Sequence, residues 1–143
     1  MISHVSIGVK DLAAAKGFYD KTLAPLGIKC LAEGDSYLGY GAGGPEFWVL
    51  AIKHPVKDDP ESGLHFCLLA PSRKAVDGFH AAALKSGGRD NGKPGIRKDY
   101  GENYYAAFVV DPEGYRGYVR QKEEAFRRAL AEQRARPAPA PGP

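Results

Sequence analysis

The chain has 143 residues and a mass of 15.4 kDa, a length that suggests one compact domain or two small halves with a shared core. Apolar residues make up 43% and charged residues 26%, which is ordinary for a soluble globular protein, and the net charge of +3 is small. A nucleic-acid-binding protein normally has a far more basic body, and no apolar run approaches the roughly 18–20 residues that span a bilayer. The composition therefore argues against nucleic-acid and membrane partners.

The two cysteines, Cys30 and Cys67, form no CxxC motif. This argues against a disulfide scaffold and a thiolate zinc site, and it fits a reducing cytosol. The first residues lack the basic start and long apolar stretch of a signal peptide, so we expect a cytoplasmic protein. Four histidines remain as candidate ligands or bases: His4, His54, His65 and His80.

The first half of the chain predicts one strand, one helix and three further strands. Alternating apolar residues and helical spacing define these elements, and an Asp cap marks the start of the helix. In chain order they are a strand over 2–9, a helix capped by Asp11, and strands near 28–33, 36–41 and 46–53. Gly27 ends the helix or the turn after it. Residues 54–61, with two prolines and a charge cluster, then break the pattern as a linker.

The same order of elements returns after the linker. It comprises a strand over 63–70, a helix capped by Ser72 and ended by Gly87 and Gly88, and strands near 95–98, 103–110 and 115–120. His65 stands 61 residues after His4, and the same offset aligns five identities: Ala14 with Ala75, Gly17 with Gly78, Phe18 with Phe79, Leu23 with Leu84, and Gly27 with Gly88. The sequence therefore predicts a duplicated βαβββ unit.

The predicted fold class is α+β, with two paired βαβββ modules that form curved mixed sheets around a cavity. The domain spans 1–120, with units 1–53 and 62–120, because each unit alone would leave a sheet face and its edges uncovered. Residues 121–136 predict a C-terminal helix with one apolar stripe, which packs peripherally, forms a dimer contact or covers a cavity. Residues 137–143 predict an extended Pro/Ala tail.

His4 and His65 hold equivalent places on the first strands of the two units. The alternate face of each strand holds the residues expected to pack on the helices, so both imidazoles should point away from the helices. Pseudo-twofold symmetry would bring them towards each other, and two convergent imidazoles are the start of a metal site. The alternative is that each histidine has only a hydrogen-bonding, structural role.

The other candidates have structural interpretations. We expect His54 to be exposed in the linker, His80 to be structural on a helix surface, and Cys67 to be a buried neutral thiol on the face of His65. The Asp111-Pro-Glu-Gly114 segment predicts a turn with no independent functional meaning.

Four short motifs carry a family resemblance. They are Ile2-Ser-His-Val-Ser-Ile-Gly-Val-Lys-Asp-Leu12, Gly17-Phe-Tyr-Asp20 with Leu26-Gly27, Gly63-Leu-His-Phe66, and Asp111-Pro-Glu-Gly114. Together with the paired units, they make the chain resemble the vicinal oxygen chelate superfamily, which contains glyoxalase I, extradiol dioxygenases and bleomycin-resistance proteins. The resemblance extends nearly to residue 120 and implies two four-stranded sheets that curl round a cavity, often in a homodimer.

The resemblance also implies a set of metal ligands. In metal-dependent members a histidine on the first strand of each unit and a carboxylate after the Asp-Pro-x-Gly turn bind the ion; these positions hold His4, His65 and Tyr118. A further ligand would fall in 46–50, where Glu46 is the only carboxylate and Trp48 fills the expected inward position. A phenol must ionise to ligate well, so the implied site is incomplete. A divalent metal (Zn, Ni, Fe or Mn) and no cofactor at all both remain open.

Arg116 and Arg120 share a strand face with Tyr118. Fixed guanidinium charge on the cavity side would oppose a dication and favour a carboxylate or phosphate ligand, whereas arginines at the open ends of the strand would merely be solvated. Trp48 and Tyr104 complete the predicted ligand-binding set, Tyr104 as part of a polar aromatic cluster that could rim a pocket.

Three functions remain open, and no catalytic residue is assigned. The first is a protein of this family that binds a small molecule in the cavity between its modules, with an incomplete metal site. The alternative, which the retained histidines favour, is a divalent-metal-dependent lyase, isomerase or dioxygenase that acts on vicinal oxygens of a small substrate. The third is a structural or regulatory module that acts through the C-terminal helix.

Overall fold

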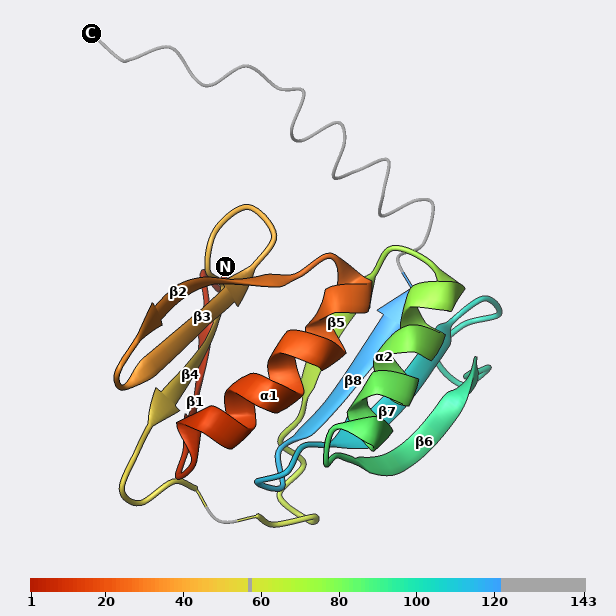
Figure 1. Cartoon of the computed structure of the whole chain (residues 1–143). Helices are drawn as coiled ribbons and strands as arrows, with labels where there is room; N and C mark the ends of the chain where they lie inside the picture. Colours follow the sequence, from red (N-terminus) through yellow and green to blue (C-terminus); the bar gives the residue numbers. More distant parts are fainter. Residues whose placement is uncertain (57, 122–143) are drawn as a thin grey trace, which may run out of the picture.

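A computed structural model describes residues 1–56 and 58–121 and contains the predicted repeat of elements (Figure 1). The elements are β1 (Val5–Val9), α1 (Leu12–Leu23), the 3-10 turn η1 (Ala24–Leu26), β2 (Lys29–Gly34), β3 (Tyr37–Gly41), β4 (Phe47–Ala51), β5 (Phe66–Ala70), α2 (Arg73–Lys85), β6 (Arg89–Ile96), β7 (Tyr105–Val110) and β8 (Arg116–Gln121). The predicted helix over 121–136 and the tail over 137–143 lie outside the described residues, except that Gln121 ends β8.

The strands form two four-stranded mixed sheets, which confirms the predicted α+β fold class. Their strand orders are β1-β4-β3-β2 and β5-β8-β7-β6. In each sheet the first strand is parallel to the last strand of its module, and the other pairs are antiparallel. Helices α1 and α2 pack against each other and lie on the same side of the sheets (Figure 1). Between the described strands, no backbone pairing joins one sheet to the other.

The predicted helix caps are present in the structure. Asp11 Oδ1 accepts a hydrogen bond from the Ala14 N–H at 2.9 Å, and Ser72 Oγ accepts one from the Ala75 N–H at 3.1 Å. Helix α1 ends at Leu23, because Pro25 cannot donate a backbone hydrogen bond and the chain tightens into η1. Gly27 therefore ends the turn after the helix, which is one of the two predicted possibilities. Gly27 then turns the chain with a φ of 76°.

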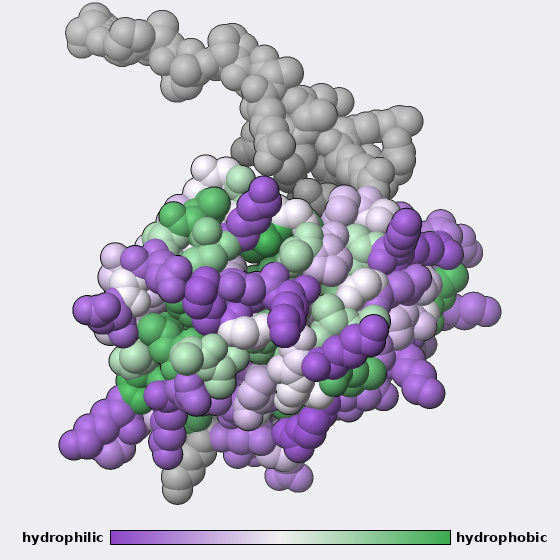
Figure 2. All heavy atoms as spheres, viewed as in Figure 1, coloured by the Kyte–Doolittle hydropathy of each residue, from purple (hydrophilic) through white to green (hydrophobic). Residues whose placement is uncertain are grey.

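The core lies between the helices and the sheets. Alternating residues of β1 and β5 enter it, and Phe18, Leu23 and Phe79 fill it from the two helices. On the outer side of the helices, Figure 2 shows mostly hydrophilic residues with smaller apolar areas between them. None of the helices that the structure describes is long and apolar enough to cross a membrane.

Three local predictions were wrong. Strand β6 begins at Arg89 rather than near residue 95, because two glycines and a proline hide its strand pattern. His80 is 7% exposed rather than on the helix surface, since Asp90 of β6 lies against it with Oδ1 2.8 Å from Nε2; its expected structural role is consistent with this contact. Cys67 is exposed rather than buried, because it lies on the face of β5 that no helix covers.

The repeated glycines of the two helices stand in different surroundings. A Cβ added at Gly17 of α1 would meet no atom within 4 Å, whereas at Gly78 of α2 it would lie 3.2 Å from Cβ of Pro25. We therefore expect Gly17→Ala to raise the free energy of unfolding by about 0.5–1 kcal/mol, through helix propensity, and Gly78→Ala to gain clearly less. Urea denaturation followed by circular dichroism measures both, and equal gains would contradict the packing at Gly78.

Candidate functional site

The Asp111-Pro-Glu-Gly turn binds the second module to the first. Asp111 is 5% exposed, and its Oδ2 accepts a hydrogen bond of 2.5 Å from the Tyr19 hydroxyl of α1. Its Oδ1 accepts hydrogen bonds from the backbone N–H of Glu113 at 2.9 Å and of Tyr115 at 2.8 Å. Burial raises the pKa of Asp111 and raises that of Tyr19 well above its usual range, so the phenol stays protonated and donates.

Two neighbours of Asp111 extend this junction. The Tyr115 hydroxyl donates to the carbonyl of Gly8 in β1 at 2.7 Å. Glu113 Oε1 accepts from the backbone N–H of Lys10 at 2.6 Å and of Asp11 at 3.1 Å, where α1 begins. The sequence predicted only a turn for this segment. The signal for its contacts with the first module is the run of polar and aromatic residues directly after a buried strand.

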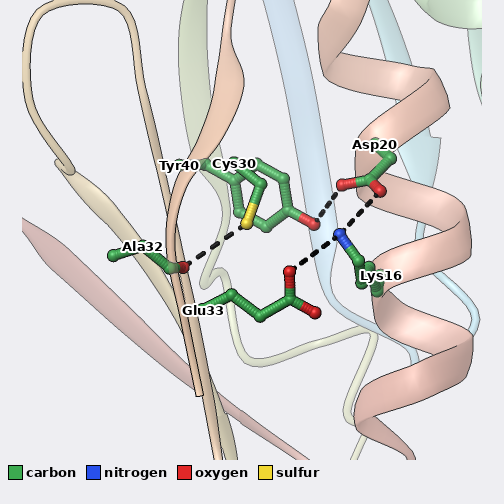
Figure 3. Close-up of polar contacts among 6 residues, drawn as sticks. All are labelled: Lys16, Asp20, Cys30, Ala32, Glu33 and Tyr40. Carbon is green, nitrogen blue, oxygen red and sulfur yellow. Dashed lines mark hydrogen bonds and ion pairs between the residues drawn. The ribbon is translucent and has the colours of Figure 1, made fainter.

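A second polar cluster fixes α1 to the first sheet (Figure 3). The Tyr40 hydroxyl donates to Asp20 Oδ1 at 2.9 Å, and Lys16 Nζ lies 3.0 Å from Asp20 Oδ2 and 3.5 Å from Glu33 Oε2. Burial is the main reason that the pKa of Tyr40 is raised. The sequence did not predict this cluster, because its residues come from three separate elements, α1, β2 and β3. The Lys16 side chain is 35% exposed, so its ion pairs contribute modestly to stability and have a structural role.

A crevice lies between the two modules on the helix side of the sheets. It holds about 420 Å³ of empty space, part of it open to solvent. Its walls are mainly aromatic and come from both modules: Phe18, Tyr19, Phe47, Phe66, Phe79 and Tyr115. Because these residues belong to or pack on the core, the crevice opens on the opposite side of the strands from the predicted histidine face.

The histidine face is the uncovered face of the sheets. His4 and His65 each stand one residue before the first strand of their module, and both are exposed. His4 Nδ1 lies 2.8 Å from Ser3 Oγ, and His65 Nδ1 lies 3.1 Å from the Gly63 carbonyl oxygen. Over residues 1–56 and 58–121, no three His, Cys, Asp or Glu side chains group closely enough to hold a metal ion.

The strand registers make Trp48 and Tyr118 equivalent. Trp48 of β4 pairs with Ser6 of β1, and Tyr118 of β8 pairs with Cys67 of β5, which stands 61 residues after Ser6. The side chain of Tyr118 lies outside what the structure describes. An aromatic residue therefore occupies the same strand position in each module.

The other predicted site residues lie apart. Glu46 is exposed just before β4, and Trp48 packs edge-on against Tyr37 with ring centroids 6.0 Å apart. The Arg116 guanidinium donates to the Pro60 carbonyl at 2.5 Å and to Ser62 Oγ at 3.3 Å, so it holds the linker. Arg120 instead stacks over Tyr104, with its guanidinium carbon 4.8 Å from the ring centroid.

Comparison with known proteins gives one family. A model of the Glyoxalase/Bleomycin resistance protein/Dioxygenase superfamily matches residues 1–117. A solved glyoxalase/bleomycin resistance protein from Albidiferax ferrireducens T118 is 30% identical, covers 85% of this chain and 98% of its own, and superposes with a TM-score of 0.74.

Two more distant structures share the fold. A putative glyoxalase from Bacillus halodurans is 23% identical over 85% of this chain and 96% of its own, with a TM-score of 0.64. A fosfomycin resistance protein, FosX, from Listeria monocytogenes is 12% identical over 89% of this chain and 97% of its own, also with a TM-score of 0.64. Among curated proteins, none matches this chain.

Proposed function

Because the chain belongs to the glyoxalase/bleomycin resistance protein/dioxygenase superfamily, we propose that it binds a small molecule between its modules, on the side of the sheets that no helix covers, and that its metal site is incomplete. The observation that carries this proposal is the equivalence of Trp48 and Tyr118 in the strand registers. Each stands where the family resemblance implies a ligand, and neither supplies the carboxylate that a divalent ion prefers.

The donor set that remains does not fit a divalent ion well. Two exposed imidazoles, His4 and His65, would supply no negative charge, and Glu46, the one carboxylate in the segment 46–50, is itself exposed. The aromatic residues instead suit an organic ligand, because an indole or phenol offers a large surface with a polar edge. We further propose that the protein forms a homodimer, as the family resemblance implies, and that it acts in the cytoplasm, which its cysteine content favours.

A ligand titration tests the binding proposal. Trp48 is the only tryptophan, and it is half-buried on the uncovered face of the first sheet. Its fluorescence should therefore change saturably with some members of a panel of small aromatic and anionic compounds. His54→Ala, in the exposed linker, is the matched control and should leave the response unchanged. A panel that produces no saturable change, with no binding by calorimetry, would overturn the proposal.

Metal analysis separates this proposal from the metal-dependent lyase, isomerase or dioxygenase that the two retained histidines favour. We expect protein purified without chelator to lose Zn, Ni, Fe and Mn on dialysis, and His4→Ala and His65→Ala to behave like the wild type. Tyr118→Glu restores the carboxylate of the implied pattern and should raise metal retention. Stoichiometric metal that survives dialysis in the wild type and is lost in both histidine variants would establish the alternative instead.

A further inference from the structure

The uncovered face of the second sheet carries two arginines that stack on aromatic rings. The guanidinium carbon of Arg120 lies 4.8 Å from the ring centroid of Tyr104, and that of Arg97 lies 5.2 Å from the ring centroid of Phe108. Tyr104 and Phe108 are four residues apart, so their side chains lie on the same face of the sheet. Arg120 of β8 pairs with Ala106, which stands midway between them. The two cations therefore belong to one surface, which we name the Arg97–Arg120 face.

Both guanidinium groups are held in place rather than free in solvent. Arg97 Nη2 donates to the Lys93 carbonyl at 2.5 Å, and the side chain lies across Gly92 and Gly95, where an added Cβ would come within 3.3 Å and 3.2 Å of its terminal nitrogens. Arg120 is half-buried against Tyr104, which is itself 9% exposed. Stacking of this kind orders the guanidinium plane before any ligand arrives.

The charge of this face has no partner among the residues that the structure describes. Among the described residues, the ion pairs involve Lys16, His80 and Arg89 as the basic partners. None of these pairs includes Arg97 or Arg120. In addition, Nε of Arg120 is buried and makes no hydrogen bond. That N–H is out of a ligand's reach, so an anion would bind through the terminal Nη groups of the guanidinium, which have no carboxylate partner among the described residues.

An aromatic surface adjoins these cations. Tyr100 is 68% exposed, and its ring centroid lies 5.3 Å from that of Tyr104, whose other neighbour is the Arg120 guanidinium. A ligand ring can therefore pack on Tyr100 while an oxyanion on the same ligand meets Arg120. Arg97 adds a second positive charge on the same side of β7.

We propose that the Arg97–Arg120 face binds an aromatic carboxylate, with the carboxylate on Arg120 and the ring on the exposed Tyr100. The inference rests on the proposed small-molecule function and names the chemical class of its ligand. A planar carboxylate matches the planar fork of a guanidinium and can accept two parallel hydrogen bonds from it. A neutral analogue of the same shape would keep the ring contact and lose the charge-assisted bonds.

The test compares 1-naphthoate with the neutral 1-naphthamide by calorimetry on the full chain. We expect the carboxylate to bind at least about 10-fold more tightly than the amide, Arg120→Gln to weaken carboxylate binding by about 10- to 100-fold, and Arg120→Lys to retain part of it. Inorganic phosphate should compete with naphthoate, because it offers the oxyanion without the ring.

The matched control is Arg73→Gln. Arg73 also stacks on a tyrosine of β7, with its guanidinium carbon 5.0 Å from the ring centroid of Tyr105, but Tyr105 packs towards the core on the opposite face. This variant should leave naphthoate binding unchanged. Thermal unfolding checks that Arg120→Gln remains folded, and Arg120→Lys keeps the test valid if it does not.

The outcomes separate the two proposals. Equal binding of acid and amide, unaffected by Arg120→Gln, would overturn the assignment of an anionic ligand while leaving small-molecule binding intact. Binding of neither compound would overturn the aromatic carboxylate, and the Trp48 fluorescence panel would then decide the broader proposal by itself.

Discussion

Asp111→Ala is expected to lower the free energy of unfolding by about 3–5 kcal/mol. The change removes the acceptor of the Tyr19 hydroxyl and of two backbone N–H groups, and Asp111 is 5% exposed. Water reaches such a site poorly, so these donors lose their partners without replacement. Urea denaturation followed by circular dichroism measures the loss.

Two variants show whether the loss comes from the hydrogen bonds. Asp111→Asn keeps a carbonyl oxygen for the backbone donors, and it should cost about 1–2 kcal/mol. Tyr19→Phe removes a single bond to the same carboxylate and should cost a similar amount. If Asp111→Ala stays within about 1 kcal/mol of the wild type, the turn does not join the modules as described.

Gly88→Ala is expected to lower the free energy of unfolding by about 3 kcal/mol, for a steric reason. An added Cβ would lie 2.8 Å from Cε2 of Phe18, 2.9 Å from the carbonyl oxygen of Ala83 and 3.1 Å from that of Val110. Two of these atoms are backbone, so rotation of one side chain cannot relieve the crowding. Phe18 is 2% exposed in the core, which leaves its ring little room to move.

The matched control is its partner in the repeat, Gly27. There nothing lies within 4 Å of an added Cβ, but φ is 76°, a conformation that costs an alanine about 1–2 kcal/mol. Gly27→Ala should therefore be the milder variant, and denaturant titration of both gives the comparison. A Gly88→Ala protein as stable as the wild type would mean that α2 and β6 approach less closely than the structure shows.

These two glycines illustrate how much of the fold could be predicted from sequence. The repeat, the caps at Asp11 and Ser72 and the order of strands follow from local patterns of polarity, which the fold preserves. The same local patterns cannot distinguish Gly27 from Gly88, because one is required by its own dihedral angle and the other by Phe18 of the first module. Contacts between modules depend on packing across long sequence separations.

The candidate site shows the same division. Strand alternation assigned His4 and His65 to the face without helices, and the family resemblance directed attention to Tyr118 and Trp48. Sequence could not show that Arg116 turns back to hold the linker while Arg120 stacks on Tyr104. Both side chains lie on the same face of β8. Their contacts differ because different segments of the chain lie next to the two ends of that strand. The roles of Asp111 and Tyr19 were missed for the same reason.

The absence of backbone pairing between the two described sheets affects how this chain can open. Parting the modules would break the Asp111 junction and the contact of α1 with α2, but it would leave every strand ladder intact. Each module is then a candidate cooperative unit of its own, and an opening between the modules would be silent to amide hydrogen exchange in the strands. Side-chain contacts would set the free energy of that motion, so the aromatic crevice, which is already partly open to solvent, could widen without unfolding either half.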